Sequence, residues 1–327
     1  MRKPVLVVGS ANVDLVCSVD RIPEPGETVT GCRFDIFHGG KGANQAVAVA
    51  KLGYPVSMVA KVGDDEFGDR LRRGLRMARV DVKAVVAARQ TSSGVALIAT
   101  DRQGQNSIVV IPGANGKLLP KDLGKLLPLV RSAGMILTQL EVPLETVECL
   151  ARLAQRFDIP LMLDPAPARE LPSSLMRRVT FLTPNETETA VLSGIRTEEL
   201  TPSTAPAIAQ ELLGRGPQNV ILKMGCQGAY VAADGLREFL PAFKVRAVDS
   251  TAAGDAFNGG LAVALARGSA LLPAAEFATA VAALSVTRLG AQPSLPTAGE
   301  LSKFLKAHPR SLDRNHPSPA SQIRLAG

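Results

Sequence analysis

Short apolar runs alternate along most of the chain with segments in which apolar residues recur every three to four positions. The runs predict buried strands over residues 5–8, 56–62, 135–140, 161–163, 181–182 and 220–223. The periodic segments predict helices over residues 42–52, 66–77 and 144–157. Because strands and helices alternate, the pattern predicts an α/β fold with a parallel sheet that is covered on both faces.

Two regions depart from this alternation and predict β-hairpins. They span about residues 15–37 and 94–111, with turns at Pro23–Gly26 and Asp101–Gly104. Together they could form one small sheet beside the main domain, which would act as a lid or cover its open face by forming a homodimer. We expect one large domain over residues 1–308, and a disordered Pro/Ser/Arg-rich tail over residues 309–327.

The composition indicates a folded, non-exported protein. The chain has 327 residues, of which 46% are hydrophobic, which is too apolar for a disordered chain. It contains no apolar run of about 18 residues, so no membrane span is expected. The apolar run at the N-terminus ends at Gly9 and is soon followed by Asp14, unlike a signal peptide. The four cysteines lack Cys-x-x-Cys spacing, and we expect reduced thiols and a cytoplasmic location.

The scarce residue types exclude several kinds of chemistry. The only histidines are His38, His308 and His316, which argues against a Ser-His-Asp triad or a multi-histidine metal site. The net charge is +7, but no dense basic run occurs, tryptophan is absent and aromatic residues make up 4%. We therefore expect no nucleic-acid partner, because stacking platforms need aromatic side chains. Carboxylates, lysines and backbone amides are left to carry the chemistry.

The most specific segment runs from Val248 to Leu261, where small residues lead into an apolar helix that continues to about Ala266. Its residues 252–255 should lie at the N-terminus of that helix, where free N–H groups and the helix dipole bind anions. Asp255 is then well placed to take a proton from a hydroxyl that attacks a phosphate. The alternative is that Asp255 only caps the helix, and the neighbouring Gly254 and Asp249 favour the catalytic interpretation.

Polar residues also follow the other predicted strands. The glycine-rich turn at 37–46 leads into a helix and could direct Lys41 and Asn44 at a polar ligand, although it is not a Walker A loop and could be a plain tight turn. Carboxylates and amides follow further strands, at Asn12 and Asp14, at Gln139 and Glu141, and at Asn185 and Glu186. Such positions bind ligands in open α/β sheets and suit vicinal hydroxyls. For each of them taken alone, capping of the next helix is the competing interpretation.

Three segments together resemble the ribokinase/PfkB family of carbohydrate kinases. They are the run from Gly39 to Ala46, the run from Ala50 to Gly68 and the run from Asp249 to Gly260. The resemblance extends from about Val5 to Leu305 and is greater to the ribokinase branch than to the fructokinase branch. It implies a ribokinase-like three-layer α/β/α sandwich with a mainly parallel central sheet and a small β-sheet lid. It also implies ATP-dependent phosphorylation of D-ribose at O5, with Mg²⁺, activation by K⁺, and a homodimer formed through the lid.

The resemblance also implies roles for individual residues. Asp255 would be the general base, and the anion hole for the transferring phosphate would be formed by Ala252, Ala253 and Gly254. The sugar hydroxyls would be held by Asn12, Asp14, Gly40, Lys41, Asn44 and Glu141. The ATP site would be lined by Asn185, Lys223, Gly225, Cys226, Gln227, Gly228 and Gly254, with Glu188 near the magnesium. The monovalent cation would be bound, largely through backbone carbonyls, by Asp249, Thr251, Ser285, Arg288, Gly290 and Ser294.

The chain departs from the family pattern at one position. Members of the family often have asparagine before the Pro-Ala-Pro run, whereas this chain has Asp164, which could alter the local charge.

The alternative substrates are 2-deoxyribose, another small sugar or a nucleoside, and Asp14 favours ribose because a carboxylate suits a pair of hydroxyls. A non-catalytic sugar or nucleotide sensor is the alternative from another class, and a sensor could lose Asp255.

Overall fold

The computed structural model describes residues 2–309 and is built around a nine-stranded, mainly parallel sheet. The strand order is β13-β12-β11-β10-β9-β8-β1-β4-β5. Pairing is parallel from β5 through to β11, and β12 and β13 add an antiparallel edge. The strands of this sheet are β1 (Val5–Val8), β4 (Val56–Gly63), β5 (Asp81–Ala88), β8 (Met135–Thr138), β9 (Leu161–Leu163), β10 (Phe181–Leu182), β11 (Asn219–Lys223), β12 (Gly228–Ala233) and β13 (Leu236–Pro241).

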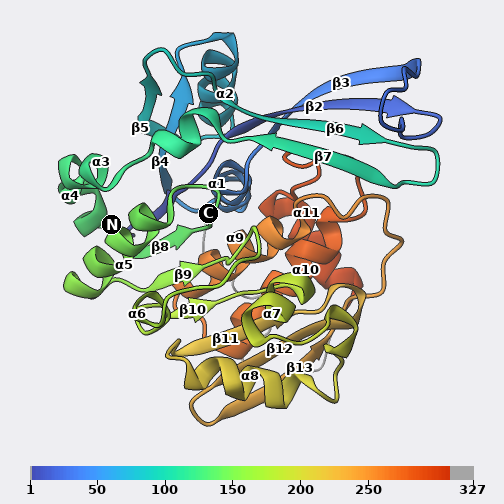
Figure 1. The fold of residues 1–327 in the computed structure, drawn as a ribbon. Coiled ribbons are helices and arrows are strands. Elements are labelled where there is room, and N and C mark those ends of the chain that lie inside the picture. The colour runs from blue at the N-terminus through green and yellow to red at the C-terminus, as the bar shows by residue number, and fades with distance from the viewer. Residues whose placement is uncertain (1, 310–327) are drawn as a thin grey trace.

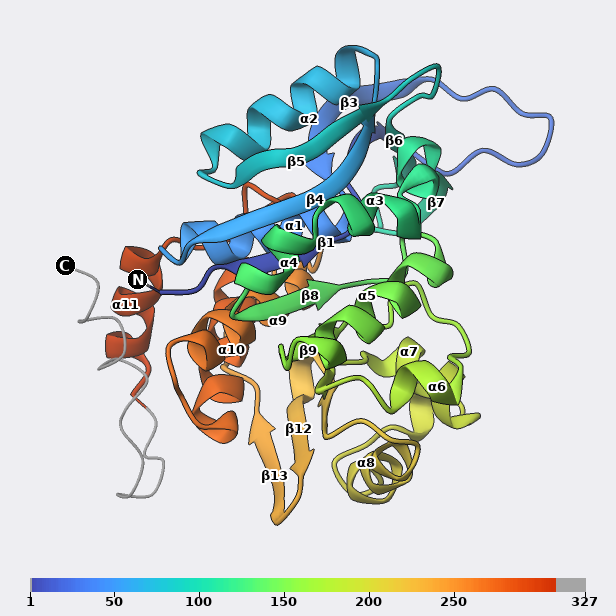
Figure 2. The same ribbon diagram turned by 90° about the vertical axis from the view of Figure 1, so that its left-hand side faces the viewer.

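Helices cover both faces of this sheet and give the molecule three layers (Figures 1 and 2). One layer contains α1 (Lys41–Lys51), α2 (Glu66–Met77), α9 (Ala253–Ala266), α10 (Leu271–Ser285) and α11 (Ala298–Ala307). The opposite layer contains α3 (Pro120–Lys125), α4 (Leu127–Ser132), α5 (Leu144–Arg156), α6 (Ser173–Met176), α7 (Glu186–Ser193) and α8 (Ala205–Gly214).

The central strand β1 shows why the sequence produces two cores. All four of its residues are buried. Val5 and Val7 pack with the layer of α1 and α9, whereas Leu6 and Val8 pack with the layer of α5 and α8. Successive side chains of a strand point to opposite faces, so a strand covered on both sides must be apolar at every position. A continuous β-branched and leucine run is therefore the sequence signature of this position in the sheet.

A separate four-stranded sheet projects from the N-terminal half, at the upper right of Figure 1. Its order is β3-β2-β6-β7, with β2 (Asn12–Val19), β3 (Gly31–Gly39), β6 (Gly94–Thr100) and β7 (Asn106–Ile111). β2 pairs with β3 and β6 with β7 as antiparallel hairpins, and β2 pairs with β6 in parallel. The two predicted hairpins therefore do combine into one sheet.

The structure confirms the predicted fold class. The predicted strands and helices are present, and their ends differ from the predicted ones by three residues or fewer. The predicted helix over 66–77 has those bounds, and Asp65 caps its start by accepting a hydrogen bond from Gly68 N. The strands β5, β12 and β13 were not predicted. Within the described residues, no helix is both long and apolar enough to cross a membrane. The predicted tail lies outside the described residues from 310 onwards.

Candidate active site

The carboxyl ends of the parallel strands bring the predicted polar residues to one edge of the main sheet. Glu141 lies three residues beyond the end of β8, Asp164 directly follows β9, and Lys223 is the last residue of β11. These strands are neighbours or near neighbours in the sheet, so their ends lie on one line. The N-terminal ends of α1 and α9 face the same edge, which places the glycine-rich turn and the segment before Asp255 together.

The helix α9 starts in an unusual way. Its N-cap residue, Ala252, is in the left-handed region at φ 60°, and the first intrahelical hydrogen bond runs from Ala256 N to Ala252 O at 2.8 Å. The N–H groups of Gly254 and Asp255 precede that bond and point out of the helix end. Ala253 N instead donates to Ser250 O at 3.1 Å. Of the three residues of the predicted anion hole, Ala253 thus has its N–H engaged, whereas Gly254 has a free N–H beside that of Asp255.

Asp255 is the third residue of α9 and does not cap it, so the capping interpretation is wrong. Its side chain points into the protein, and the residue as a whole is only 4% exposed. One carboxylate oxygen accepts from Asn44 Nδ2 at 2.9 Å, and the other accepts from Gln45 Nε2 at 3.1 Å. Both donors lie near the N-terminal end of α1, so the contact between α1 and α9 fixes the orientation of the carboxylate.

The electrostatic environment of Asp255 suits proton transfer near neutral pH. Burial raises the pKa of Asp255 to about 7; the Lys41 ammonium opposes this shift and the Asp164 carboxylate adds to it. A general base works best when its pKa is close to the operating pH, because it is then both ionised and able to hold a proton. The carboxylate of Asp255 is thus suited to accept a proton from a substrate hydroxyl.

Acidic and basic side chains of the predicted sugar site influence one another. Burial raises the pKa of Asp14 to about 7, with further contributions from Glu141 and Asp255. Burial lowers the pKa of Lys41, but the surrounding carboxylates, led by Asp255, hold it above its usual value. Glu141 accepts hydrogen bonds from Ser10 Oγ and from Lys41 N at 3.0 Å. These groups form one charged cluster around the carboxylate of Asp255.

The remaining predicted sugar residues hold the backbone in place. Gly40 adopts φ 86°, and a Cβ added there would lie 2.7 Å from Asn12 N, so only glycine lets these segments meet. Asn12 Oδ1 accepts from Asn115 Nδ2 at 2.6 Å, and Asn115 Oδ1 accepts from Ala11 N at 2.9 Å. Asn115 therefore orients Asn12 from a distant loop.

The predicted nucleotide residues fall into two groups. Asn185 and Glu188 form a reciprocal cap of α7: Glu188 N donates to Asn185 Oδ1 at 2.9 Å, and Asn185 N donates to Glu188 Oε2 at 2.8 Å. Burial raises the pKa of Glu188. The turn Gly225–Gln227 is exposed, whereas Lys223 is buried and donates from Nζ to Asp164 Oδ1 at 2.9 Å. Gly228 packs against the backbone at the end of β13, where a Cβ would collide with Leu240 O, so Gly228 could contact a ligand only through its backbone.

The predicted cation residues lie on two segments, one just before α9 and one that begins at the end of α10. Hydrogen bonds join the two segments side by side. Val248 N donates to Val286 O at 2.7 Å, and Asp249 Oδ2 accepts from Gly290 N at 2.8 Å. Although burial alone would raise the pKa of Asp249, hydrogen bonds from Thr251 and Gly290 hold it below its usual value. Oxygen-rich loops of this kind suit a hard monovalent cation.

The individual side chains of that set are engaged differently. The Ser285 and Ser294 hydroxyls donate to the carbonyls of Ala282 and Ala291. Arg288 forms an ion pair with Glu300 at 2.8 Å, so its side chain points toward α11. Backbone carbonyls, as the resemblance implies, are then the groups of this loop that could bind a cation. Among residues 2–309, no cluster of three or more His, Cys, Asp or Glu forms a metal site.

Sequence reasoning missed several residues that complete the site. Gln45 joins Asp255 to Asp164, and Asn115 orients Asn12. Gln45 stands next to Asn44, which was singled out, and its amide was the available signal. Gln139, which the sequence did single out as a strand-end amide, donates from Nε2 to Gln45 Oε1 at 2.5 Å. Nothing in the local sequence marks Asn115, which lies in a short 3₁₀ turn. The His38 ring lies against Gly74 on α2.

Comparison with known proteins identifies the class to which this fold and site belong. The profile of the pfkB family carbohydrate kinases matches residues 2–298. The chain therefore belongs to the PfkB family of carbohydrate kinases. Within the family, it is 40% identical over 301 residues to the ribokinase of Bacillus subtilis, covering 92% of this chain and 99% of that protein.

Two further relatives bear on the choice of sugar. The deoxyribokinase of Salmonella typhi is 39% identical over 302 residues, covering 92% of this chain and 98% of that protein. The structure of Arabidopsis thaliana ribokinase complexed with ribose and ATP has a TM-score of 0.87 at 33% identity, covering 94% of this chain and 99% of that chain. Fold and family are thus established, and relatives that act on ribose and on deoxyribose are about equally similar.

Proposed function

We propose that this protein transfers the γ-phosphoryl group of ATP to O5 of D-ribose. The observation that carries the proposal is Asp255, a buried carboxylate at the N-terminal turn of α9 that two amides of α1 hold in place. It lies on the same helical turn as the free N–H groups of Gly254 and Asp255, so one turn of helix can serve both the attacking hydroxyl and the phosphoryl group. The similarity to ribokinases supports ribose as the sugar.

In the reaction, Asp255 accepts the proton of O5 as the new O5–P bond forms and the bond from phosphorus to the ADP oxygen breaks. Phosphoryl transfer depends mainly on alignment and on neutralising charge. The N–H groups of Gly254 and Asp255 would stabilise the oxygens of the transferring group, and Lys41 would add a positive charge. Asn12, Asp14, Asn44 and Glu141 would hold the other sugar hydroxyls, because amides and carboxylates match hydroxyl donors and acceptors.

Two metal ions belong to the proposal. Magnesium would neutralise the ATP phosphates, and the buried carboxylate of Glu188 offers the hard oxygen ligand it prefers, with ATP and water as the remaining ligands. Potassium would order the loop before α9, where Asp249 already ties residues 249 and 290 together. Asp249, Thr251, Ser285, Gly290 and Ser294, with the backbone of Arg288, would surround it.

The proposed dimer interface is the four-stranded sheet β3-β2-β6-β7, which is the predicted lid. Every residue of β7 is exposed, and Ile108, Val109 and Val110 are between 49% and 58% exposed. An exposed strand of apolar residues is stabilised when another sheet covers it, so we propose a homodimer formed through the lid. The four cysteines are free among the described residues, which is typical of the cytoplasm that we propose as the location.

The test is release of ADP from MgATP with D-ribose, with and without potassium, and with 2-deoxyribose as the competing sugar. We expect potassium-stimulated turnover with a higher kcat/KM for D-ribose, and NMR of the product should show phosphate on O5. A higher kcat/KM for 2-deoxyribose would contradict the sugar assignment and favour the alternative that the deoxyribokinase similarity suggests. Binding of sugar and nucleotide without any turnover would instead favour a sensor.

A further inference from the structure

A buried ion pair joins two strand ends on the nucleotide side of the site. Lys223, at the end of β11, approaches Asp164, which follows β9, with Nζ 2.9 Å from Oδ1. Their side chains are only 11% and 3% exposed. Removing two charges from water costs free energy, and the attraction between them often repays that cost only in part. Stability alone is therefore a weak reason for placing this pair here.

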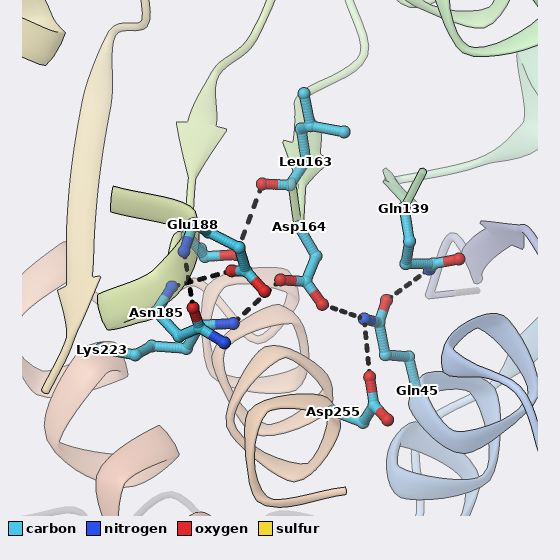
Figure 3. A network of polar contacts seen from close by, with 9 residues as sticks. Gln45, Gln139, Leu163, Asp164, Asn185, Glu188, Lys223 and Asp255 are labelled. Atoms are coloured by element: carbon cyan, nitrogen blue, oxygen red, sulfur yellow. Dashed lines mark hydrogen bonds and ion pairs between the residues drawn. The ribbon is translucent and has the colours of Figure 1, made fainter. Parts of the chain in front are cut away.

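The second oxygen of Asp164 connects the pair to the general base. Asp164 Oδ2 accepts from Gln45 Nε2 at 2.9 Å, and the same nitrogen donates to Asp255 Oδ1 at 3.1 Å (Figure 3). An unbroken series of contacts thus runs from the ammonium of Lys223 to the carboxylate that we propose as base. Gln139 fixes the amide of Gln45 from the other side, so that its nitrogen faces both carboxylates.

The ammonium of Lys223 also lies at the end of α9. A Cβ added to Gly254 would have Lys223 Nζ as its nearest neighbour, at 3.3 Å. Gly254 supplies one of the N–H groups that face a phosphoryl group in the proposed reaction. Burial lowers the pKa of Lys223, but the carboxylates of Asp164 and Glu188 raise it above its usual value, so the ammonium is charged.

We propose that Lys223 is a catalytic residue that contacts the transferring phosphoryl group, and that Asp164 is a positioning residue that holds its ammonium beside Gly254. This inference rests on the proposed function. Negative charge spreads over the phosphoryl oxygens in the transition state, and a fixed cation at the helix end stabilises it. Asp164 shares its two oxygens between Lys223 and Gln45, so it sets the positions of the cation and the base together.

The first experiment measures binding rather than turnover. In the full chain with magnesium, titration calorimetry compares the β,γ-imido analogue of ATP with ADP, because only the analogue carries a γ-phosphoryl group. We expect Lys223→Met to weaken the analogue about 10–100-fold, the range typical of a hydrogen bond to a charged group, and ADP by less than about threefold. Equal weakening of both nucleotides, or of neither, would overturn the proposed contact.

The second experiment separates catalysis from folding. Lys223→Met and Asp164→Asn each leave one partner of the pair alone, so each should lower the Tm. The double variant should recover most of that loss because neither member of the pair is then left charged without the other. We expect kcat on D-ribose to stay about 100-fold or more below wild type in the double variant. Recovery of kcat together with Tm would show that the pair is only structural, and would overturn the proposal.

A matched control comes from a second partly buried pair on another part of the sheet. Lys61, on β4, pairs with Asp122 at 2.7 Å, and their side chains are 14% and 18% exposed. Lys61→Met should lower the Tm but leave kcat and the preference for the analogue over ADP unchanged. If wild-type protein shows no turnover on ribose, the proposed function fails, while the binding comparison still tests the contact of Lys223 with the γ-phosphoryl group.

Discussion

The carboxylate of Asp255 accepts a hydrogen bond at 2.9 Å from the side-chain amide of Asn44, a residue 211 positions earlier in the chain. This contact joins the N-terminal turns of α9 and α1. Asn44 Oδ1 is buried and has no hydrogen-bond partner within the described part of the chain. The amide can therefore donate to the base on one side and still accept from a substrate hydroxyl on the other. In the proposed reaction, this one side chain would link the sugar to the base.

Substitution of the base should abolish most turnover while keeping the fold. In Asp255→Asn, Asn44 can rotate its amide and accept from the introduced nitrogen, so the contact between α1 and α9 persists. We expect kcat to fall about 10²–10⁴-fold, the usual contribution of general-base catalysis, and the affinity for ADP to stay within about threefold. Steady-state kinetics and calorimetry measure the two quantities. Asp234→Asn, in the exposed β12–β13 turn, is the control, and near-normal turnover of Asp255→Asn would refute the base assignment.

The raised pKa values give a stability prediction with a definite sign. Asp255 and Asp14 have a pKa of about 7 when folded and 3.8 as the reference value, so the folded protein binds more protons between these limits. Their contribution to the free energy of unfolding is fully present below about pH 4 and is lost as the pH rises through 7. Asp255→Asn lacks the group and should gain Tm relative to wild type as the pH rises from about 4 to about 8. Thermal melts across that range measure the difference, and a constant difference would contradict the shift.

The same pKa values predict the acid limb of the rate profile. Asp255 must be ionised to accept a proton, so kcat/KM for the sugar should decline as the pH falls below about 7. Two groups titrate in this range, and the decline should steepen because Asp14 also becomes protonated. Asp14→Asn should leave a single titration. A profile that stays flat down to about pH 5 would show that neither group limits the reaction.

The choice between ribose and 2-deoxyribose should depend on Asp14. Its carboxylate lies in the charged cluster near Glu141 and Asp255, where a pair of hydroxyls can be bound. Asp14→Ala should reduce the ratio of kcat/KM for D-ribose to that for 2-deoxyribose about 10-fold or more, because a hydrogen bond to a charged group is lost only for the sugar that makes it. Competition kinetics with both sugars measure the ratio. An unchanged ratio would place the discrimination elsewhere.

The lid interface can be tested on the face that does not carry Asp14. Leu97 and Val109 lie opposite each other on β6 and β7, and they are 46% and 58% exposed. Asp14 and its neighbour Ala96 lie one position away and so face the other side of the sheet. Val109→Lys should convert the proposed dimer to a monomer in sedimentation experiments. Asn106→Lys, near the tip of the same strand, makes the same change of charge and should leave the dimer intact.

The sequence predicted the elements whose hydrophobic pattern is complete. β1 and β9 are buried at every position, and α2 carries its own cap at Asp65, so their bounds follow from local residues. β5 was missed because only part of it is buried. The β12–β13 hairpin was also missed, although its Asp234-Gly235 turn is a strong local signal and Gly235 has the expected positive φ of 68°.

The candidate site divides in the same way. Asp255, Lys41 and Asn44 stand in motifs whose residues are adjacent in sequence, so they could be recognised there. Gln45, Asp164 and Lys223 acquire their relationship only when β9, β11 and α1 are brought together. No local pattern encodes that contact. The sequence showed the departure at Asp164 and named Lys223 for the ATP site, but only the fold shows that the two form a pair.

The order of the strands has a consequence for folding during synthesis on the ribosome. From β8 onward each new strand, through β13, is added beside the one made just before it, so this side of the sheet extends outward in the order of synthesis. β1, by contrast, stays an open edge until β8 emerges some 130 residues later. The part of the chain that holds Asn44 can therefore fold before β9 to β13 have been made, and Asn44 meets Asp255 only after a further 211 positions have been translated. A nascent chain gains the oriented carboxylate of Asp255 only once α9 has been synthesised and packs against α1.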